Sequence, residues 1–586
     1  MELIYRKSRF LALALVVALF GAACGSSDDD SGSATSTTLS GTSTTEGADD
    51  NNDDANEAKY GGSLVVGISA ETNTWTPGLA NLAASGMTVA HAIYDPLVWL
   101  NSNGEFVGYL AESIEANEDI TAWTLKLREG VTFHDGTALD AEVVKWNFDN
   151  LHFAPTSQSY GYLVAAKVDN LEVIDPLTVR YNLTEANSAF PDLLRGGPGL
   201  VVSQAAYEAD PDGFGDHPVG TGPFMMKEWR RDDRAVVTRN ENYWMKDANG
   251  DQLPYLDQIT FRPIPDGESR YQALMAGDID VIQTNDGTDI ANLVELSNGN
   301  DFAVTVVKNN SAGAILLNVL VPPMDDVRIR QALLMAGDSE AAREVLGTLA
   351  EAEAATGFYA SDSPWYSAEA AQVYNDLVDA GLEKAVELVE AYKADPARSD
   401  GGSPGDPVEI TYTCATDPTL AILAQLQQSL WARAGINTTL ESLDEGTMVT
   451  NVVGGVDTEP RFKGTYMANC WQAGGGLEDP LSTLGPFFGA VASSPGNFTN
   501  YTNAAIDEEI DVLRTSDDFA TRYGAVEKIQ KVVASEVPII WSSQSISAVG
   551  YRATIVGIAD WTLPSGEAGT GNPDGTMRFH QVALAQ

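Results

Sequence analysis

The pattern of apolar and polar positions is clearest between residues 123 and 148. Residues 123–127 alternate apolar and polar side chains, which predicts a half-buried strand. A Glu-Gly turn separates this strand from a second apolar pair at 131–133, and an Asp-Gly turn follows. Asp140 then occupies the position of a helix N-cap, ahead of apolar residues at helical spacing. The segment is predicted to fold as strand, turn, strand, turn and helix.

Short strands and helices are predicted along the rest of the chain. The strands are apolar runs or alternating segments bounded by glycine, proline or polar residues. No repeat of fixed period is visible. The mixture indicates an α/β protein. A buried first strand is expected within 59–68, and an alternating segment lies at 171–181. Strands are also expected at 255–262, 280–282, 408–414 and 465–470 and from 539 onward, and helices at 269–276, 366–394 and 420–434.

The N-terminus has the pattern of an export signal. Basic residues precede an unbroken apolar run from 10 to 20, which is too short to span a bilayer. Small residues lead to Cys24, and this arrangement resembles a lipobox, in which the cysteine is diacylated and becomes the mature N-terminus. The lipobox pattern favours leucine at the position of Gly21, so an ordinary signal-peptidase site is the alternative. We expect a signal peptide at 1–23 and lipidation at Cys24.

A polar tether is predicted next. Residues 24–58 consist almost entirely of small, polar and acidic residues, which cannot build a core, so this segment should be disordered. A lipid anchor followed by such a tether would hold the protein at a membrane and leave the folded part free to tumble. No later segment is apolar enough to span a membrane.

Charge narrows the choice of partners. The 586-residue chain carries 34 Lys and Arg against 83 Asp and Glu, a formal charge of −49. Nucleic-acid binding needs clustered basic residues, and none are present, so no nucleic-acid partner is expected. The acidic surface favours solubility outside the cell and mildly favours cationic solutes.

Catalytic and metal-binding patterns are missing from the sequence. There is no G-x-S-x-G, H-E-x-x-H or P-loop, no G-x-G-x-x-G follows a predicted strand, and the five histidines are scattered. The run 247–251 is similar to the start of a calcium loop, but Gln258 stands where that loop needs glutamate, so a polar turn is the better interpretation. We expect no enzyme activity, no catalytic residues, no metal and no cofactor.

Two cysteines remain if Cys24 carries lipid. Cys414 and Cys470 each end a predicted strand, and outside the cytoplasm two such thiols tend to pair. We expect a disulfide, which the chain-entropy description values at about 4 kcal/mol. Two separately buried thiols are the alternative.

The segment from 123 to 148 also resembles, nearly residue for residue, the signature of a known family. Its core at 127–137, Leu-x-x-Gly-Val-x-Phe-His-Asp-Gly-Thr, is similar to that of the large extracytoplasmic solute-binding proteins of ABC importers, the peptide/nickel class or solute-binding protein family 5. Residues 93–98, 218–224 and 323–332 resemble other parts of the same family.

This resemblance implies an α/β, two-lobed periplasmic-binding-protein-like fold of class II, cluster C type, with an extra subdomain in the first lobe. The expected division is a lobe I core at 59–98, 220–314 and 539–586, an extra subdomain at 99–219, and lobe II at 315–538.

The resemblance also implies a function. The chain would be a monomeric, membrane-anchored substrate-binding component that captures a small solute between its lobes by hinge closure and delivers it to ABC permease and ATPase subunits. A peptide is the default solute, and an oligosaccharide or another non-peptide solute is the alternative. A ligand-sensing lipoprotein of the same fold, without transport, is a third interpretation. The location would be the outer face of the cell membrane, or the periplasmic side where an outer membrane is present.

Three stretches at strand ends are expected to line the binding site, since open α/β sheets bind ligands there. Each combines a tryptophan with amide or carboxylate groups, a mixture that suits peptides or sugars, although core packing is the alternative for each tryptophan. The candidate residues are Glu71, Asn73 and Trp75; Trp471, Gln472 and Asp479; and Trp541 and Gln544.

One position departs from the family pattern. Peptide-binding members carry Trp-x-Ala-Asp-Tyr in lobe II, where the aspartate holds the α-ammonium of the ligand. Aligning on Trp471 and Ala473 places Gly474 at that aspartate. Asp479 would substitute only if the intervening glycine-rich loop folds back. The usual peptide anchor is therefore in doubt.

Overall fold

The structure is a computed structural model that describes residues 60–80, 82–348, 352–444, 447–448, 451–452, 464–473, 479–489 and 497–585. The expected signal peptide at 1–23, the lipidation site Cys24, the tether at 24–58 and Gly474 lie outside the described residues. The names lobe I, extra subdomain and lobe II are used below for the residue ranges given above.

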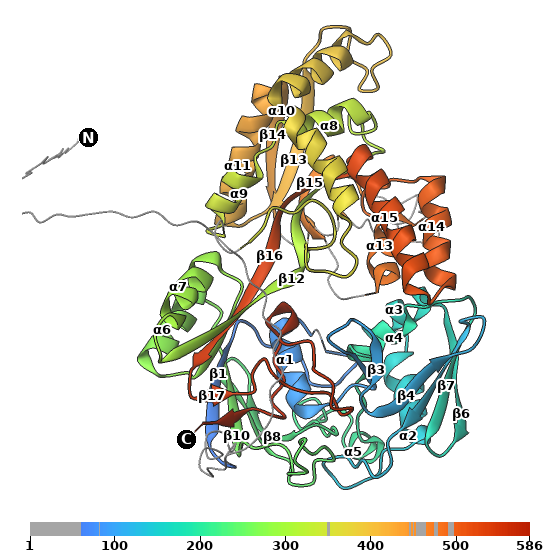
Figure 1. Cartoon of the computed structure of the whole chain (residues 1–586), viewed down its shortest axis with the longest axis vertical. Coiled ribbons are helices and arrows are strands. Elements are labelled where there is room, and N and C mark those ends of the chain that lie inside the picture. Colours follow the sequence, from blue (N-terminus) through green and yellow to red (C-terminus); the bar gives the residue numbers. More distant parts are fainter. Residues whose placement is uncertain are drawn as a thin grey trace, which may run out of the picture. The chain divides into compact units, whose positions relative to one another are not determined.

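One large sheet runs through both lobes. Within the described residues its ten strands follow the order β14-β13-β15-β12-β16-β11-β1-β10-β9-β8 (Figure 1). The neighbours of β1 in lobe I run parallel to it, and so do the neighbours of β13 in lobe II. The strands are β1 Ser63–Ile68, β8 Phe224–Arg230, β9 Arg234–Arg239, β10 Gln258–Pro263, β11 Val281–Thr284, β12 Phe302–Leu317, β13 Val408–Ala415, β14 Ile436–Leu443, β15 Ala468–Ala473 and β16 Ile539–Arg552.

The long antiparallel pair β12 and β16 connects the lobes (Figure 1). At one end β16 pairs with β11 of lobe I, and at the other end β12 pairs with β15 of lobe II. The register between the pair shifts between Lys308 and Ala312 and again between Ala312 and Ala314. Such irregularities bend and twist a strand pair locally. They fall at the expected boundary between the lobes.

A second sheet of four strands, in the order β4-β5-β7-β6, forms the extra subdomain. The predicted strand at 123–127 is confirmed as part of β5, and Asp140 caps the following helix by accepting from the Val143 amide at 2.9 Å. The second strand expected at 131–133 is wrong, because the chain folds back at the Asp-Gly turn and forms only an isolated bridge between Thr132 and Ala138. The remaining strands are β2 Val98–Leu100, β3 Phe106–Gly108, β4 Ala111–Ala116, β5 Ala122–Leu127, β6 Val168–Asp175, β7 Thr178–Leu183, β17 Ile555–Val556 and β18 Ala583–Leu584.

Helices cover the sheets in both lobes (Figure 1). In lobe I and the extra subdomain they are α1 Ala84–Ile93, α2 Ala141–Asn147, η1 Phe148–His152, α3 Tyr160–Ala165, α4 Phe190–Leu193, η2 Gly197–Gly199, α5 Gln204–Ala209, α6 Gly267–Ala276, α7 Gly287–Ser297 and η3 Pro573–Gly575. In lobe II they are α8 Val327–Met335, α9 Ser339–Val345, α10 Ala368–Ala394 with a break at Gly381, α11 Pro418–Arg433, α13 Pro480–Phe488, α14 Ala504–Thr515 and α15 Phe519–Glu536.

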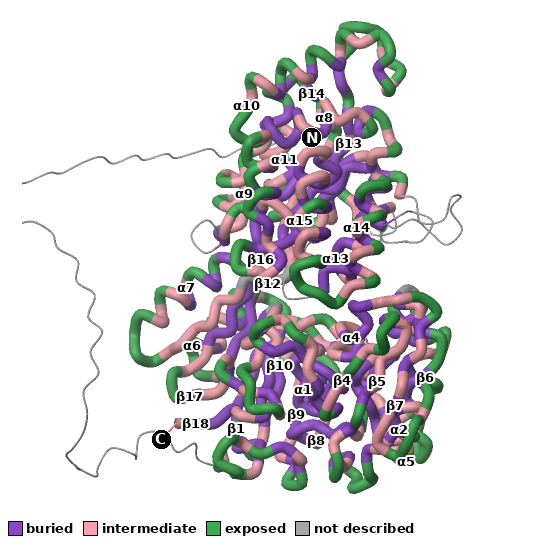
Figure 2. Tube along the Cα trace, turned by 45° about the vertical axis from the view of Figure 1, so that its right-hand side comes forward, coloured by how far each residue is buried: buried purple, intermediate pink, exposed green. Residues whose placement is uncertain are grey.

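Each lobe has its own apolar core, and the buried residues follow the strands (Figure 2). In lobe I, alternate residues of β1 (Leu64, Val66 and Ile68) are buried under α1. In lobe II, Trp431 of α11 is buried and its indole N–H donates to the Leu333 carbonyl at 3.0 Å. A side chain of this size that leaves water contributes roughly 2–3 kcal/mol.

Candidate functional site

Side chains of β16 donate hydrogen bonds to the backbone of β12 at the positions where the register between these two strands shifts. The Gln544 amide donates to the Ser311 carbonyl at 2.9 Å, and the Ser542 hydroxyl donates to the Gly313 carbonyl at 3.0 Å. A Cβ atom at Gly313 would lie only 2.7 Å from the Ser542 oxygen, so glycine allows this close approach. These bonds satisfy part of the backbone that the irregular ladder leaves without partners.

A row of small polar residues lies at the carboxyl ends of the lobe I strands. Ser69, directly after β1, lies 2.7 Å from the Ser85 hydroxyl at the start of α1, and Ser85 donates to the Gln283 oxygen of β11 at 3.3 Å. Ser547 of β16 and Gly575 lie beside Gln283. Open α/β sheets bind ligands at this edge. The sequence analysis missed this row. Ser69 directly follows β1, whereas Gln283 and Ser547 lie inside β11 and β16, so the available signal was a polar residue within or just after a buried strand.

The first predicted group lies at the same end of β1 but is engaged within lobe I. Glu71 accepts from the Trp229 indole at 3.0 Å and from the Asp232 amide at 2.6 Å. Asn73 is exposed and donates to the Leu79 carbonyl at 3.0 Å. Trp75 is only 2% exposed and packs edge-on against Trp229. In this structure the group fastens the loop after β1 to the β8–β9 hairpin.

The second and third groups meet at β12. Ala314 of β12 is paired with Trp471 of β15 on one side and with Trp541 of β16 on the other. Residues directly opposite in a ladder project from the same face, so both tryptophans share one face of the sheet. Trp541 is buried against Phe358, whereas Trp471 is half-buried and packs edge-on against Phe498.

The two glutamines differ in exposure. Gln472, opposite Gly313 and next to Trp471 in β15, is exposed, so its amide is available to a ligand. Gln544 is 2% exposed and bonds the backbone of β12 as described above. The structure therefore brings Trp471, Gln472, Trp541 and Gln544 together around β12, and it places Glu71, Asn73 and Trp75 in a separate contact network.

Asp479 is committed to internal contacts. Its oxygens accept from Arg522 Nη2 at 2.6 and 2.7 Å, and one oxygen also caps α13 by accepting from the Leu481 amide at 2.9 Å. The carboxylate is 4% exposed. Burial raises the pKa of Asp479, although the adjacent Arg522 guanidinium lowers it. A carboxylate paired in this way has little capacity left for a ligand ammonium.

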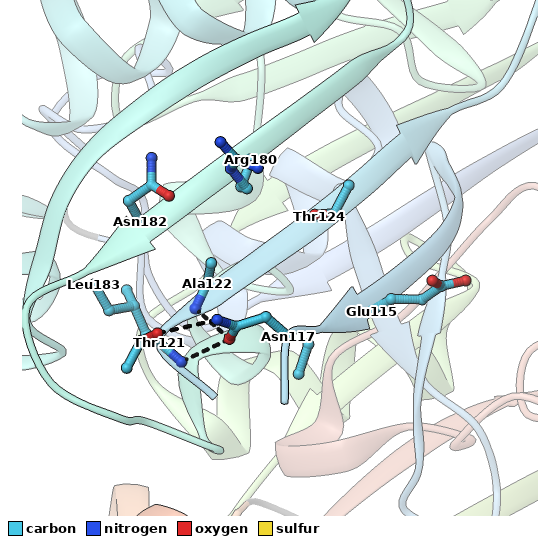
Figure 3. A pocket seen from close by; sticks show the side chains of 9 residues that line it. Glu115, Asn117, Thr121, Ala122, Thr124, Arg180, Asn182 and Leu183 are labelled. Atoms are coloured by element: carbon cyan, nitrogen blue, oxygen red, sulfur yellow. Dashed lines mark hydrogen bonds between the residues drawn. The ribbon is translucent and has the colours of Figure 1, made fainter. Parts of the chain in front are cut away.

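Two surface hollows lie in lobe I and the extra subdomain, and none of the predicted ligand residues lines them. The first, of about 500 Å³, lies over the four-stranded sheet, where the Asn117 oxygen accepts from the amides of Thr121 and Ala122 (Figure 3). The second, of about 640 Å³, is lined by Glu112, Lys126, Arg128, Glu129, Gly130, Trp244, Met245, Lys246 and Pro564.

The described residues carry a disulfide but neither a metal-ligand cluster nor a membrane-spanning helix. Within them no group of three or more His, Cys, Asp or Glu side chains is arranged to hold a metal ion. The helices of the same residues include none with the length and apolar character needed to cross a bilayer. Cys414 and Cys470 form a disulfide between β13 and β15, with Cα atoms 4.9 Å apart.

Known proteins are similar to this chain in sequence and in fold. A glutathione-binding protein, GsiB, from Shigella dysenteriae is 27% identical over 479 residues, which covers 81% of this chain and 88% of the relative. The substrate-binding protein CtaP of an ABC transporter from Listeria monocytogenes has a similar structure, with a TM-score of 0.72 at 21% identity over 90% of this chain and 100% of CtaP. DppA from Helicobacter pylori, solved with the peptide STSA, has a TM-score of 0.70 at 21% identity, over 90% and 99% of the two chains.

The family profile settles the relationship. Residues 105–495, well over half of the chain, match the middle region of the bacterial extracellular solute-binding proteins, family 5. The fold is accordingly the two-lobed α/β fold that the resemblance implied. The chain belongs to the bacterial extracellular solute-binding proteins of family 5.

Proposed function

We propose that this protein is the lipid-anchored, extracytoplasmic solute-binding component of an ABC importer, and that it captures a peptide-like solute between its lobes. The observation that carries the proposal is family membership together with the two crossing strands. GsiB is named for glutathione and DppA was solved with a peptide, which favours a short peptide as the solute class.

The way in which the lobes are joined supports the proposal of hinge closure. The strands β12 and β16 pass between them, and their pairing is irregular between Lys308 and Ala314, so a change of backbone angles there would turn one lobe against the other. Contacts that a solute makes with both lobes exist only in the closed arrangement, so binding shifts the population toward it. A permease that recognises the closed form would then receive loaded protein.

The solute contacts that we propose centre on Trp471 and Gln472. Of the predicted residues around β12, these two are the ones with exposed surface, and they sit beside the strand that crosses between the lobes. A half-buried indole and a free amide can stack on and hydrogen-bond a peptide unit.

A non-peptide solute is the second candidate. The pairing of Asp479 with Arg522 occupies the carboxylate that would have replaced the family aspartate missing at Gly474 only if the glycine-rich loop folded back. A buried ligand ammonium without a charge partner would cost several kcal/mol. This observation favours a solute without a free α-ammonium, such as an oligosaccharide or a modified peptide.

Native mass spectrometry of the protein purified from its own cells tests the solute class, because a solute enclosed between lobes is retained. We expect a bound mass whose fragments are those of a peptide. Trp471→Ala and Gln472→Ala should each weaken binding of the recovered solute by about ten-fold in calorimetry. Tyr162→Ala, a highly exposed aromatic residue on α3, is the matched control and should leave affinity unchanged. A bound mass that fragments as a sugar would favour the second candidate, a non-peptide solute. Unchanged affinity in both Trp471→Ala and Gln472→Ala would refute the proposed solute contacts.

The anchor is tested separately. Cys24→Ser should release the protein from the membrane fraction if Cys24 carries the lipid. A variant that stays in the membrane fraction would contradict the lipid anchor and leave the solute-binding proposal untouched.

A further inference from the structure

Arg578 is a buried cation enclosed by aromatic rings in lobe I. Its side chain is 3% exposed, and its guanidinium carbon lies 3.9 Å from the ring centre of Trp99, 4.8 Å from that of Tyr109 and 5.4 Å from that of Trp561. Such rings stabilise a cation through their faces, and the Tyr109 hydroxyl also interacts with the guanidinium. Nε and Nη2 of Arg578 are buried and have no hydrogen-bond partner among the described residues.

These two nitrogens form one edge of the guanidinium, the edge that binds a carboxylate side-on. Two other arginines of the molecule show the geometry. Arg398 places Nε and Nη2 at 2.6 and 2.5 Å from the two oxygens of Asp400, and Arg328 places the same pair at 3.0 and 2.6 Å from those of Asp326. Bidentate pairing of this kind is the strongest that arginine makes with a carboxylate. In Arg578 the equivalent edge has no carboxylate partner among the residues that the structure describes.

The neighbouring polar groups of the described residues are either engaged elsewhere or without a partner themselves. Asp95 is the carboxylate whose charge acts on Arg578, but its oxygens already accept from Tyr243 at 3.1 Å, Trp244 at 2.8 Å and Thr221 at 3.3 Å. His91 packs edge-on against Trp99, and both of its ring nitrogens are buried without a partner among the described residues. Burial, with help from Arg578, holds the pKa of His91 well below its usual range, so its ring is neutral and offers one N–H donor.

A hollow of mixed charge borders this cluster. Trp244, which donates to Asp95 and packs edge-on against Tyr109, also lines the hollow of about 640 Å³ described above. Lys126, Arg128 and Lys246 line the same hollow together with Glu112 and Glu129, and Lys126 is paired with Glu112 at 2.7 Å.

We infer that the Nε–Nη2 edge of Arg578, with His91 beside it, is a binding site for a carboxylate group of a small ligand. A buried guanidinium whose edge is unpaired costs several kcal/mol, and a carboxylate would satisfy both N–H groups at once while the indoles of Trp99 and Trp561 cover its apolar substituent. The carboxylate belongs either to a free small acid or to the transported solute, and the inference does not require the solute to be a peptide.

Tryptophan fluorescence tests the site, because Trp99 lies in contact with Arg578. Titration of the full protein with acetate should give a saturable change in emission. Arg578→Lys keeps the charge but removes the fork edge and should weaken acetate binding about ten-fold or more. Arg328→Lys is the matched control: its edge is filled by Asp326, so acetate affinity should not change. His91→Phe, which keeps the ring but removes both nitrogens, should give a smaller loss.

The source of the carboxylate is separated with glutathione and its glycyl ethyl ester as probes. If the ligand carboxylate is the solute's, glutathione should bind the wild type about ten-fold more tightly than the ester, and this preference should vanish in Arg578→Lys. Saturable acetate binding without that preference assigns the site to a free acid. The absence of a saturable response to any of these probes in the wild type would overturn the inference, whether or not the variants fold, and would assign the unpaired groups to internal water. Solute binding that is equal in wild type and Arg578→Lys would leave the proposed function standing and remove this site.

Discussion

Two buried arginines, one in each lobe, are treated differently by the fold. Arg522 in lobe II and Arg578 in lobe I are 8% and 3% exposed, and both lie over a tryptophan ring. Nη2 of Arg522 donates to both oxygens of Asp479, although its Nε has no partner among the described residues. Arg578 has no carboxylate partner among the described residues, and both its Nε and its Nη2 are unpartnered there. A buried charge needs a partner, and lobe II supplies it from its own sequence. Asp479, which was predicted from the sequence to contact the ligand, is thus already paired within lobe II. Arg578, which was not predicted as a contact, has two N–H groups without a partner among the described residues.

Removing Asp479, the partner of Arg522, should have the largest effect on the difference between the two arginines. Asp479→Ala should lower the free energy of unfolding by about 4–6 kcal/mol, because a buried guanidinium without its carboxylate costs about 3–5 kcal/mol and the lost cap of α13 about 1 kcal/mol. Urea denaturation measures the change. Asp518→Ala, which removes only an exposed cap of α15, isolates the capping part and should cost about 1 kcal/mol. Equal losses in the two variants would show that the ion pair contributes nothing.

The disulfide is a second internal link of lobe II. The three cysteines of the chain give lobe I no counterpart. Replacing Cys414 and Cys470 together by serine should destabilise the protein by about 4 kcal/mol, since the bridge closes a loop across a sequence separation of 56 residues. Calorimetric unfolding of wild type and double variant checks this value. Alkylation of both thiols in the non-reduced native protein would contradict the pairing.

Asp95 is the carboxylate of lobe I whose charge acts on Arg578, as that of Asp479 acts on Arg522. Its contribution to the free energy of unfolding should depend on pH. Burial raises the pKa of Asp95 to about 6, against hydrogen bonds from Trp244 and Tyr243 and attraction from Arg578, which lower it. The folded state therefore holds this proton more tightly than the unfolded state. The stabilisation is complete below the unfolded pKa near 4 and is lost as pH rises through 6, a change of about 3 kcal/mol.

Asp95→Asn should remove this pH dependence. The difference in unfolding free energy between wild type and variant is measured by urea denaturation between pH 4 and pH 7, and it should shift in favour of the variant by about 3 kcal/mol as pH rises. A constant difference across that range would show that Asp95 is ionised throughout, which would supply Arg578 with a full counter-charge and weaken the contrast between the lobes.

The fold was largely predictable because periodicity and turn residues act locally. The strand expected within 59–68 and observed as β1, the helix that became α11 and the cap at Asp140 all follow from patterns that span fewer than twenty residues. The site was harder, since it depends on partners that are distant in sequence. The residues around Asp479 do not predict its pairing with Arg522, because Arg522 lies 43 residues further along the chain. The sequence pattern around a tryptophan at a strand end does not predict its burial. Trp541 is buried and Trp471 is half-buried, although both follow the same pattern.

The last residues of the chain complete the core of the first lobe, and this has a consequence for the order of folding. Phe579 and Val582 are fully buried with Leu64 and Val66, and the Met577 amide donates to Thr88 across a separation of 489 residues. Lobe I cannot finish its core until residues 577–582 have been made, whereas the lobe II core is built mainly from residues between 312 and 541. Contacts this distant close slowly because the chain loses much entropy when they form. We expect the first lobe to remain open while the chain crosses the membrane, and the arrival of the C-terminal segment to be the step that commits the exported protein to its native state.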